Sequence, residues 1–178
     1  MYMMKKTILL TALVASAIAY KSSGSSAEVP TETFTIDVET TCLAKNMYFE
    51  AKGQPKAGQI AVSLVVLNRV KDARFPNTIC EVVYQGPTSK WWKEEHNKDV
   101  PIKNKCQFSW YCDGKSDEIK DVYAYAGLYL LATRVIDGRY DGMLEGSTHY
   151  HATYVNPYWA KTKTYVAQIG DHIFYRWD

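Results

Sequence analysis

Residues 37–72, DVETTCLAKNMYFEAKGQPKAGQIAVSLVVLNRVKD, contain the pattern that decides the fold. Asp37 to Lys52 predicts a helix, because Asp37 can cap its N-terminus and Gly53 can end it. Pro55 can open a second helix that runs from Lys56 to Asp72. The middle of this second helix, IAVSLVVL, is apolar nearly all round, which is typical of a helix buried inside a domain. We therefore expect the second helix at the centre of the fold.

The chain beyond these two helices predicts further helix and two irregular stretches. Thr78 to Gln85 predicts a short helix, and Ser116 to Ile136 predicts a long one, because its apolar residues recur at helical spacing. Gly86 to Lys105 is polar and predicts a long loop, and loops of this length are often functional. Cys106 to Gly114 ends in the turn-forming pair Asp-Gly, which predicts the edge of a hairpin.

The C-terminal part, Ser147 to Asp178, is rich in β-branched and aromatic residues separated by turns. We expect short strands there, among them Thr164 to Ile169 and His172 to Trp177. Helices followed by strands place the chain in the α+β class, mainly helical with a small antiparallel β portion.

Length and composition exclude several classes of protein. The chain has 178 residues, of which 47% are hydrophobic and 22% are charged, so one globular domain is expected. A formal net charge of +2 excludes a nucleic-acid binder driven by bulk positive charge and a disordered charged tail. No apolar run reaches the roughly 20 residues that a membrane-spanning helix needs. Aromatic residues make up 13% of the chain, which suits either a core or the stacking of rings on sugars or bases.

The N-terminus has the features of a secretory signal peptide over residues 1–19. Two lysines precede an apolar stretch that is too short to span a bilayer, and Ala17-Ile18-Ala19 offers small residues where a signal peptidase cuts. An uncleaved membrane anchor is the alternative. Residues 20–36, rich in serine, predict a flexible leader, and residues 37–178 the folded domain. We expect an exported protein with no stable membrane anchor once the signal is removed.

The chain has four cysteines, and an even number in an exported protein indicates disulfides, with three pairings open. None forms a CxxC pair, and the spacing does not fit a structural zinc ribbon. Cys106 and Cys112 form the local candidate pair, because six residues across a hairpin can bring two Cα atoms within disulfide range. Cys42 and Cys80 then remain as a pair by elimination.

Glu50 is the candidate catalytic residue that the helical pattern singles out. Leu43, Met47 and Glu50 lie at positions i, i+4 and i+7, so a carboxyl group occupies the face where a third apolar residue is expected. Burial and the carbonyl groups of the last helical turn both raise the pKa of such a carboxyl, as general-acid catalysis requires. The alternative is that Glu50 points into solvent at the helix end, or pairs with Lys45 or Lys52.

Histidines offer a second candidate site. His149 and His151 alternate along a predicted strand and would share one face, as a metal-binding pair does, with His96 and His172 available to complete it. The chain has no HExxH motif and no acidic partner at a fixed spacing, so we expect no metal and no other cofactor. It also has no GxSxG elbow of a serine hydrolase.

An ordered series of short motifs resembles the SleB/CwlJ family of cell wall hydrolases. It opens with Leu43-Ala44, Tyr48-x-Glu50-Ala51-x-Gly53-x-Pro55 and Gly58-Gln59-x-Ala61-Val62. The resemblance extends from about Cys42 to Tyr175, nearly all of the predicted domain. The later segments that match are VLNRV at 66–70, FPNT at 75–78, VVYQ at 82–85, QFS at 107–109 with DG at 113–114, THY at 148–150, NP at 156–157 and IGxHxF at 169–174.

This resemblance implies a lysozyme-like fold and action on the glycan strands of peptidoglycan. It implies that Glu50 is the catalytic acid of a lytic transglycosylase, which cuts between N-acetylmuramic acid and N-acetylglucosamine and leaves a 1,6-anhydro end. Such chemistry needs one carboxylate, whereas most glycosidases need two. Asp113, Asp141, Glu145 and Asp171 remain open as partner acids.

We expect the substrate to be held around Glu50 by hydroxyl, amide and ring groups. The resemblance places these residues in matching family positions, and the later ones lie in polar, aromatic patches next to turn signals. They are Tyr48, Gln107, Ser109, Tyr150, His151 and Asn156. The expected protein is a monomer whose partner is peptidoglycan and not nucleic acid, located in the periplasm or secreted, at the cell wall.

Two other functions remain open at this point. One is a metal-dependent N-acetylmuramoyl-L-alanine amidase that uses His149 and His151. The other is a wall-binding module whose aromatic groove holds glycan without cutting it. Two features depart from the family's minimal pattern: the long stretch at 86–105, with Trp91 and Trp92, and the four cysteines.

Overall fold

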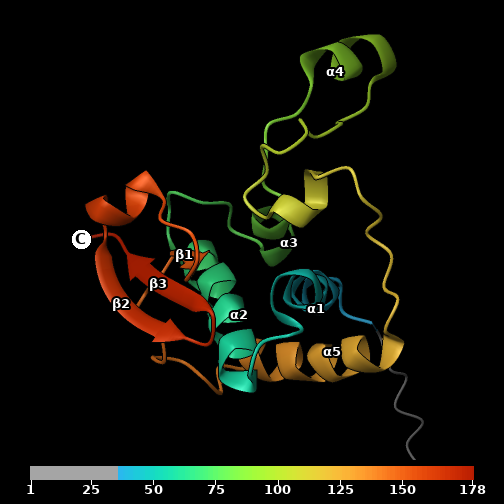
Figure 1. Cartoon of the computed structure of the whole chain (residues 1–178). Helices are drawn as coiled ribbons and strands as arrows, with labels where there is room; N and C mark the ends of the chain where they lie inside the picture. Colours follow the sequence, from blue (N-terminus) through green and yellow to red (C-terminus); the bar gives the residue numbers. More distant parts are fainter. Residues whose placement is uncertain (1–35) are drawn as a thin grey trace, which may run out of the picture. The chain divides into compact units, whose positions relative to one another are not determined.

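A computed structural model describes residues 36–178 (Figure 1). The predicted signal peptide and the leader up to residue 35 lie outside this range. Within it, no helix is both long enough and apolar enough to cross a membrane. The helices are α1 (Val38–Ala51), α2 (Lys56–Lys71), α3 (Ile79–Val83), α4 (Lys90–His96), η1 (Ser109–Cys112), α5 (Val122–Ile136) and η2 (Tyr158–Thr162), and the strands are β1 (His149–Ala152), β2 (Thr164–Ile169) and β3 (His172–Arg176).

Helices α1 and α2 form where the sequence predicts them. Asp37 caps α1, since its carboxylate accepts hydrogen bonds from the Thr40 backbone N–H at 2.7 Å and from the Thr40 hydroxyl at 2.6 Å. Pro55 stands at the N-terminus of α2. The expected burial of α2 is confirmed, because Val62, Val65 and Val66 are completely inaccessible to solvent.

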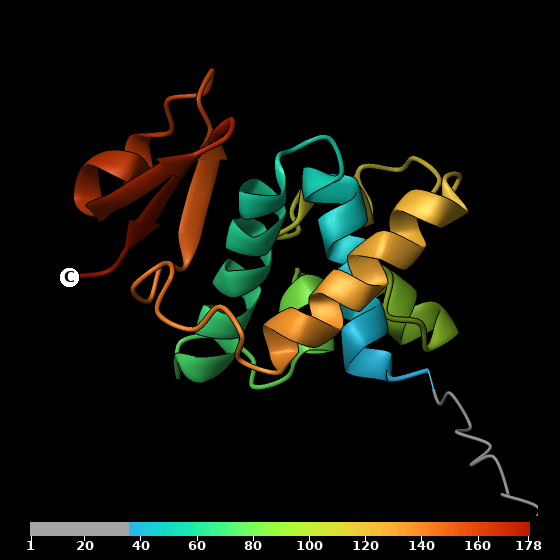
Figure 2. The same ribbon diagram turned by 90° about the horizontal axis from the view of Figure 1, so that it is seen from below.

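Helices α2, α3 and α5 pack around α1. Helix α5 packs along α1, α3 contacts both α1 and α2, and α2 lies between α1 and the sheet (Figures 1 and 2). A disulfide between Cys42 and Cys80 ties α1 to α3, with the two Cα atoms 5.2 Å apart. The hydrophobic core lies mainly where these helices meet, and Phe174 of the sheet adds a fully buried ring to it.

The three strands form an antiparallel sheet in the order β1-β3-β2, in which Tyr150 pairs with Phe174. The turn between β2 and β3 contains Gly170 at a φ of +58°, and a side chain there would collide with Gln54. Gln54 accepts a hydrogen bond from the Asp171 N–H at 3.0 Å and donates one to the Asp171 carboxylate at 3.1 Å. This pair of bonds attaches the sheet to the turn between α1 and α2.

The strand predictions and the α+β class are confirmed: β2 spans Thr164–Ile169, and β3 ends one residue before Trp177. Three other predictions are wrong. Residues 86–105 are not a plain loop, because they contain α4, which Ser89 caps. Residues 106–114 contain the short 3-10 helix η1 instead of a hairpin edge. The long helix begins at Val122 and not at Ser116, because the Asp121 carboxylate caps it by accepting from the Ala124 N–H.

Candidate active site

A cleft of about 620 Å³ lies between the end of α1, the η1 segment and strand β1. Glu50 on α1 and Arg69 on α2 line it, together with Tyr150 and His151 on β1. The η1 segment contributes residues 107–110, and the chain after it adds Asp113 and residues 115–117. His172 on β3 also lines the cleft, which therefore collects side chains from five separate parts of the chain.

Glu50 is half-buried at the end of α1, on the same helix face as the fully buried Leu43 and Met47. Burial raises the pKa of its carboxyl, while a hydrogen bond from Tyr150 and the charge of Arg69 oppose part of that rise. The direction is the one that the sequence predicts. A carboxyl with a raised pKa retains its proton to higher pH and can act as a general acid.

The alternative pairing of Glu50 with a lysine on its own helix is wrong. The Lys45 ammonium lies over the Trp110 ring, 5.3 Å from its centroid. The Lys52 ammonium lies over the Tyr48 ring and donates a hydrogen bond to the Tyr48 hydroxyl at 3.3 Å. Both cations are thus held by aromatic rings, and Glu50 faces the cleft.

Tyr150 is the closest polar partner of Glu50 that the structure gives. Its hydroxyl donates a hydrogen bond to Glu50 Oε2 at 3.0 Å. Burial and the neighbouring Glu50 charge raise the pKa of Tyr150 well above its ordinary value, so this hydroxyl keeps its proton and stays a donor. The Tyr150 ring packs against the His172 and Phe174 rings, with centroids at 5.1 and 5.6 Å.

Arg69 is a cleft residue that the sequence reasoning missed as a functional group. Only 5% of it is exposed, and its Nε donates a hydrogen bond to the Thr148 carbonyl at 2.8 Å. Phe75 and Phe108 flank the guanidinium, each with its ring centroid 5.2 Å away. Burial lowers the pKa of Arg69, and the nearby Tyr150 and Glu50 oppose that shift. The available signal was a cation directly after the apolar run of a buried helix.

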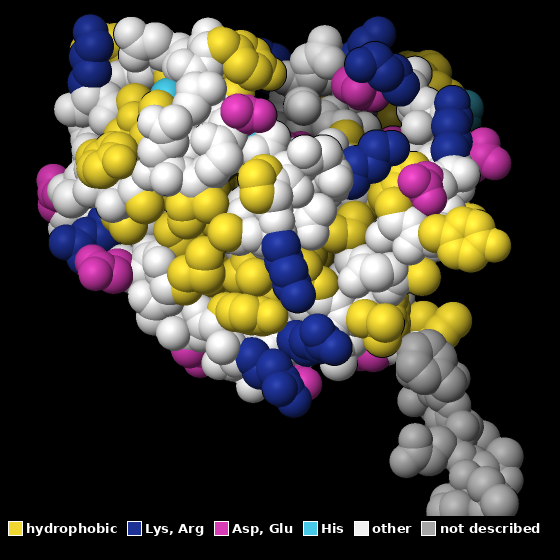
Figure 3. All heavy atoms as spheres, turned by 60° about the horizontal axis from the view of Figure 1, so that its bottom comes forward, with side chains coloured by type: hydrophobic (Ala, Val, Ile, Leu, Met, Phe, Trp, Pro, Cys, Tyr) yellow, Lys and Arg dark blue, Asp and Glu magenta, His cyan; other side chains and the backbone are white. Residues whose placement is uncertain are grey.

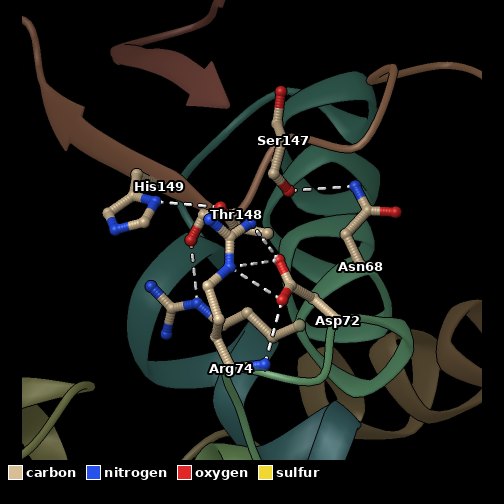
Figure 4. Close-up of polar contacts among 7 residues, drawn as sticks. Asn68, Asp72, Arg74, Ser147, Thr148 and His149 are labelled. Carbon is tan, nitrogen blue, oxygen red and sulfur yellow. Dashed lines mark hydrogen bonds and ion pairs between the residues drawn. The ribbon is translucent and has the colours of Figure 1, made fainter. Parts of the chain in front are cut away.

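The neighbouring contacts fix the start of β1 to the end of α2 (Figure 4). Asn68 donates a hydrogen bond to the Ser147 carbonyl at 2.9 Å, one residue before the carbonyl that Arg69 binds. The Thr148 hydroxyl lies 2.9 Å from Nδ1 of His149. Two consecutive residues of α2 thus bind two consecutive carbonyls, and this fixes the strand on which Tyr150 stands.

Four of the six expected substrate contacts line the cleft: Gln107, Ser109, Tyr150 and His151. Tyr48 does not, because two helical positions turn it about 200° away from Glu50. Tyr48 is 4% exposed, and its hydroxyl accepts a hydrogen bond from the Asp121 N–H at the start of α5.

Asn156 also lies outside the cleft. It is exposed in the segment between β1 and η2, beyond Tyr154 and Val155, which do line the cleft. A contact of Asn156 with the substrate therefore stays a prediction, at a position directly after two residues that line the cleft.

Of the four candidate partner acids, one lines the cleft and three lie away from it. Asp113 lines the cleft, and hydrogen bonds from Lys115 hold the pKa of its carboxyl below the usual range. Asp141 pairs with Lys71 at 3.8 Å, Glu145 with Arg176 at 4.0 Å and Asp171 with Gln54, all away from the cleft. Glu50 and Asp113 are therefore carboxyls whose pKa values the protein shifts in opposite directions.

The histidines do not assemble into one site. His149 and His151 share a face of β1, and both rings contact Trp159, at 5.4 and 5.6 Å. His96 stacks with Trp92 on α4, whereas His172 packs on Tyr150. Within residues 36–178 no group of three or more His, Cys, Asp or Glu side chains could hold a metal ion. The described residues therefore offer the metal-dependent alternative no set of ligands.

The cysteines pair as Cys42–Cys80 and Cys106–Cys112, the pairing expected from the sequence. The second disulfide closes a short loop around η1, with its Cα atoms 6.1 Å apart. It thus restrains the segment that carries Gln107 and Ser109 into the cleft.

A second hollow, of about 450 Å³, lies between α2 and α5 on the face shown in Figure 3. Hydrophobic side chains gather on this face, with Lys and Arg side chains among them. Lys52, Lys56 and Arg134 line the hollow over a floor that includes Leu128 and Leu131. Among the residues lining it there is no carboxyl or imidazole, so it lacks the acid that the cleft provides.

Comparisons with known proteins agree with the α+β fold. The catalytic domain of the germination-specific lytic transglycosylase SleB from Bacillus anthracis superposes with a TM-score of 0.51 at 24% sequence identity, over 81% of this chain and 98% of that one. The spore cortex-lytic enzyme of Bacillus cereus is 46% identical over 43 residues, and that of Bacillus subtilis 42%. These matches span 24% of this chain but only 17% and 14% of the two relatives.

The match to a family model is much longer. The model of the Cell Wall Hydrolase family matches residues 53–175, and its first matched residue lies three positions after Glu50. The match takes in α2, η1, α5 and the sheet up to Tyr175, and thus every cleft segment except the end of α1. Because it covers well over half of the chain, the protein belongs to the cell wall hydrolase family.

Proposed function

We propose that this protein cleaves the glycan strands of peptidoglycan as a lytic transglycosylase, with Glu50 as its one essential carboxyl. The observation that carries the proposal is the half-buried Glu50, with a raised pKa, bound by Tyr150 inside the cleft. Membership of the cell wall hydrolase family supports the substrate class. The relatives named as spore cortex-lytic enzymes support the same class of substrate.

In the first step, the protonated Glu50 gives its proton to the glycosidic oxygen. The bond between C1 and that oxygen breaks, and its electron pair goes to the leaving sugar. The 2-acetamido group of the substrate stabilises the positive charge at C1, so no second enzyme carboxylate is needed there. Tyr150 donates to Glu50 Oε2 and holds the carboxyl in place during the transfer.

In the second step, the Glu50 carboxylate accepts the proton of the substrate's C6 hydroxyl. The oxygen of that hydroxyl bonds to C1 and closes the 1,6-anhydro ring. Glu50 is then protonated again, and no water is consumed. One group therefore serves as acid and then as base, which suits a carboxyl whose pKa lies closer to neutrality than usual.

Gln107, Ser109 and His151 are proposed to hold the sugar rings. Gln107 and Ser109 supply an amide and a hydroxyl at the cleft surface. His151 has both ring nitrogens engaged, with Nδ1 2.9 Å from the Ala152 carbonyl and Nε2 3.1 Å from the Tyr175 hydroxyl. A carbonyl only accepts, so Nδ1 carries the proton, and the ring contributes to the cleft as a fixed surface.

We also propose that the protein works outside the cytoplasm as a monomer. Residues 1–19 would direct export, residues 20–36 would form a flexible leader, and residues 37–178 would form the catalytic domain. The two disulfides support an oxidising compartment. Peptidoglycan is the partner that this location provides.

Mass spectrometry of purified peptidoglycan after digestion tests the proposed reaction. Anhydro ends are expected, whereas reducing ends would indicate hydrolysis and freed stem peptides an amidase. Binding without any product would indicate a wall-binding module. The digestion is expected to continue in EDTA, and loss of activity that zinc restores would contradict the metal-free mechanism.

Replacing the acid tests the role of Glu50. Glu50→Gln keeps the size and the acceptor for Tyr150, and it is expected to lower the rate by a factor of about 10² to 10⁴. Glu95→Gln, which alters an exposed carboxyl on α4, is the matched control. A Glu50→Gln rate within about tenfold of the unmodified protein would reject Glu50 as the acid.

A further inference from the structure

Among residues 36–178, Arg69 is the only Lys, Arg, Asp or Glu residue that is buried, with 5% of it exposed. A buried charge costs free energy unless it is paired and hydrogen-bonded. The Nε atom of Arg69 has the Thr148 carbonyl as acceptor, but its buried Nη1 atom has no hydrogen-bond partner. No described carboxylate forms an ion pair with it within 4.0 Å. The guanidinium is therefore held in place without being neutralised.

Anchoring the strand does not by itself account for this charge. Asn68, the residue before Arg69, binds the adjacent Ser147 carbonyl with a neutral amide (Figure 4). A neutral donor at position 69 could do the same for the Thr148 carbonyl at a lower desolvation cost. The Phe75 and Phe108 rings offset part of that cost, but a bond to a carbonyl does not require the charge.

The charge of Arg69 lies in the same cleft as the catalytic carboxyl, beyond ion-pair distance from it. Arg69 lines the same cleft as Glu50, and its charge favours the ionised form of both Glu50 and Tyr150. The groups that interact directly with Glu50 are Arg69 from α2 and Tyr150 from β1. The other titratable groups lining the cleft are Asp113, Lys115 and Asp117 from the η1 side, His151 and His172 from the sheet, and Tyr154 from the segment after β1.

We propose that Arg69 is a positioning residue that stabilises Glu50 as a carboxylate between the two steps of the proposed reaction. A contact ion pair would hold Glu50 ionised before the reaction and would remove the proton it must give. A cation beyond contact distance leaves the resting carboxyl with a raised pKa, yet lowers the cost of its charge once the proton has left. This inference rests on the proposed function, because it needs Glu50 to lose and regain a proton.

The test compares the pH profiles of variants at position 69. Glu50 must be protonated to start the reaction, so the rate falls as pH rises through its pKa. The fall of the rate at high pH is the alkaline limb of the rate–pH profile. Because Arg69 lowers the pKa of Glu50, Arg69→Met and Arg69→Gln are expected to move this limb to a higher pH by roughly 1 pH unit. Arg69→Lys, which keeps a positive charge, is expected to leave the limb close to its original position. The measurement is the initial rate of fragment release from purified peptidoglycan at limiting substrate.

Asn68→Ala provides the matched control for anchoring. It removes the bond to the Ser147 carbonyl without changing any charge, so it is expected to lower the melting temperature and leave the alkaline limb in place. If Arg69→Met lowers stability but leaves the limb unmoved, Arg69 only anchors the strand and the proposal is overturned.

Arg69→Gln retains an N–H donor for Thr148 in case Arg69→Met does not fold. Failure of both neutral variants to fold, with Arg69→Lys folded and active, would assign the charge to folding and also overturn the proposal.

The outcome can be separated from the fate of the proposed function. Mass spectrometry identifies the bond that is cut, whereas the pH limb reports the protonation of Glu50 whichever product forms. Reducing ends with a shifted limb would reject the transglycosylase reaction and retain the effect of Arg69 on Glu50. Anhydro ends with an unmoved limb would retain the reaction and reject the role of Arg69.

Discussion

The floor of the cleft and the arm that carries α4 are built in opposite ways. At the cleft floor, Arg69 and Tyr150 lie 81 positions apart in sequence, and long-range hydrogen bonds hold both in place. The arm, residues 87–105, leaves the body next to α3 and carries α4 at its tip (Figure 1). Helix α4 contains no buried residue. The cleft therefore depends on contacts between segments far apart in the sequence, whereas the arm depends on contacts among its own residues.

The arm's contacts are mostly internal. Trp91, Trp92 and His96 contact one another, with ring centroids 4.7 to 5.2 Å apart. Lys93 pairs with Asp99 at 2.7 Å, with both side chains exposed. An exposed ion pair contributes little stability, so the arm is expected to open locally at low free-energy cost while the cleft stays folded.

The two disulfides give the largest test of this contrast. Cys42–Cys80 spans 38 residues and joins two core helices, whereas Cys106–Cys112 spans six residues next to the arm. Chain entropy predicts that removing the first costs about 4 kcal/mol and removing the second about 2 kcal/mol. Denaturant unfolding of the Cys42→Ala/Cys80→Ala and Cys106→Ala/Cys112→Ala variants measures both. Equal losses would show that the base of the arm is as critical as the core.

A core truncation is expected to have the next largest effect. Met47 lies one turn before Glu50 and is completely buried. Met47→Ala should destabilise the protein by about 3 kcal/mol, because it removes buried methylenes and leaves a cavity. Chemical denaturation gives the value. A loss below about 1 kcal/mol would mean that the helix under the cleft can relax to fill the space.

The pH dependence of the melting temperature is expected to respond to a histidine of the sheet, His149, and not to a histidine of the arm, His96. Burial and the charges of Lys163, Arg69 and Arg74 lower the pKa of His149 to about 4. Between pH 6.5 and 4 the unfolded chain binds a proton here that the folded chain does not, so stability falls as the pH falls, by at most about 1.4 kcal/mol per pH unit. Melting temperatures from pH 7 to 4 should fall less steeply in His149→Gln. The same change at the exposed His96 of α4 is the control, and an equal effect there would contradict the prediction.

The raised pKa of Glu50 predicts a small gain in stability when this group is made neutral. The folded state holds the Glu50 proton more tightly than the unfolded state, so this group destabilises the fold as the pH rises above the ordinary carboxyl pKa. Glu50→Gln should therefore melt at a higher temperature at pH 7, with the difference disappearing near pH 3. An unchanged difference across this range would mean that ionisation of Glu50 is not the cause.

The smallest expected effect is in the arm. Trp91 is 57% exposed and belongs to a helix that contains no buried residue. Trp91→Ala should change the free energy of unfolding by about 0.5 kcal/mol or less, despite the loss of the largest side chain type. Denaturant titration alongside Met47→Ala checks it. A loss comparable to that of Met47→Ala would show that the arm packs against the body in solution.

The same contrast explains what the sequence could predict. Helices α1, α2 and α5 bury one face or all faces, and burial leaves an apolar pattern in the sequence. Helix α4 buries nothing and leaves no such pattern, so its residues are easily taken for a polar loop. Glu50 was recognisable because a carboxyl interrupts an apolar stripe.

The cleft partners of Glu50 were harder to identify. Tyr150 is 100 positions away, and its placement beside Glu50 depends on the sheet docking against α2, which no local pattern encodes. Only the family resemblance connected the two. Arg69 lies in the last turn of α2, whose apolar pattern indicates a core helix. A cation at that position is typical of a helix C-terminus, so the pattern does not mark Arg69 as a cleft residue. Tyr48 shows the opposite error: it belongs to the same family motif as Glu50, but the helix turns its side chain towards α5.

The two ends of the arm meet at a single point. The Gln107 N–H donates to the Gln85 carbonyl at 2.9 Å, and a side chain at Gly86 would come within 2.9 Å of Cys106 Sγ and 3.1 Å of its Cα. A segment that leaves and returns at the same place behaves as a detachable insert, and changing its length costs little entropy. The arm could thus be shortened, lengthened or exchanged for another module by joining residues 86 and 106, while the reaction centre keeps its geometry. The length of the arm and the geometry of the cleft can therefore change independently, in evolution or by engineering.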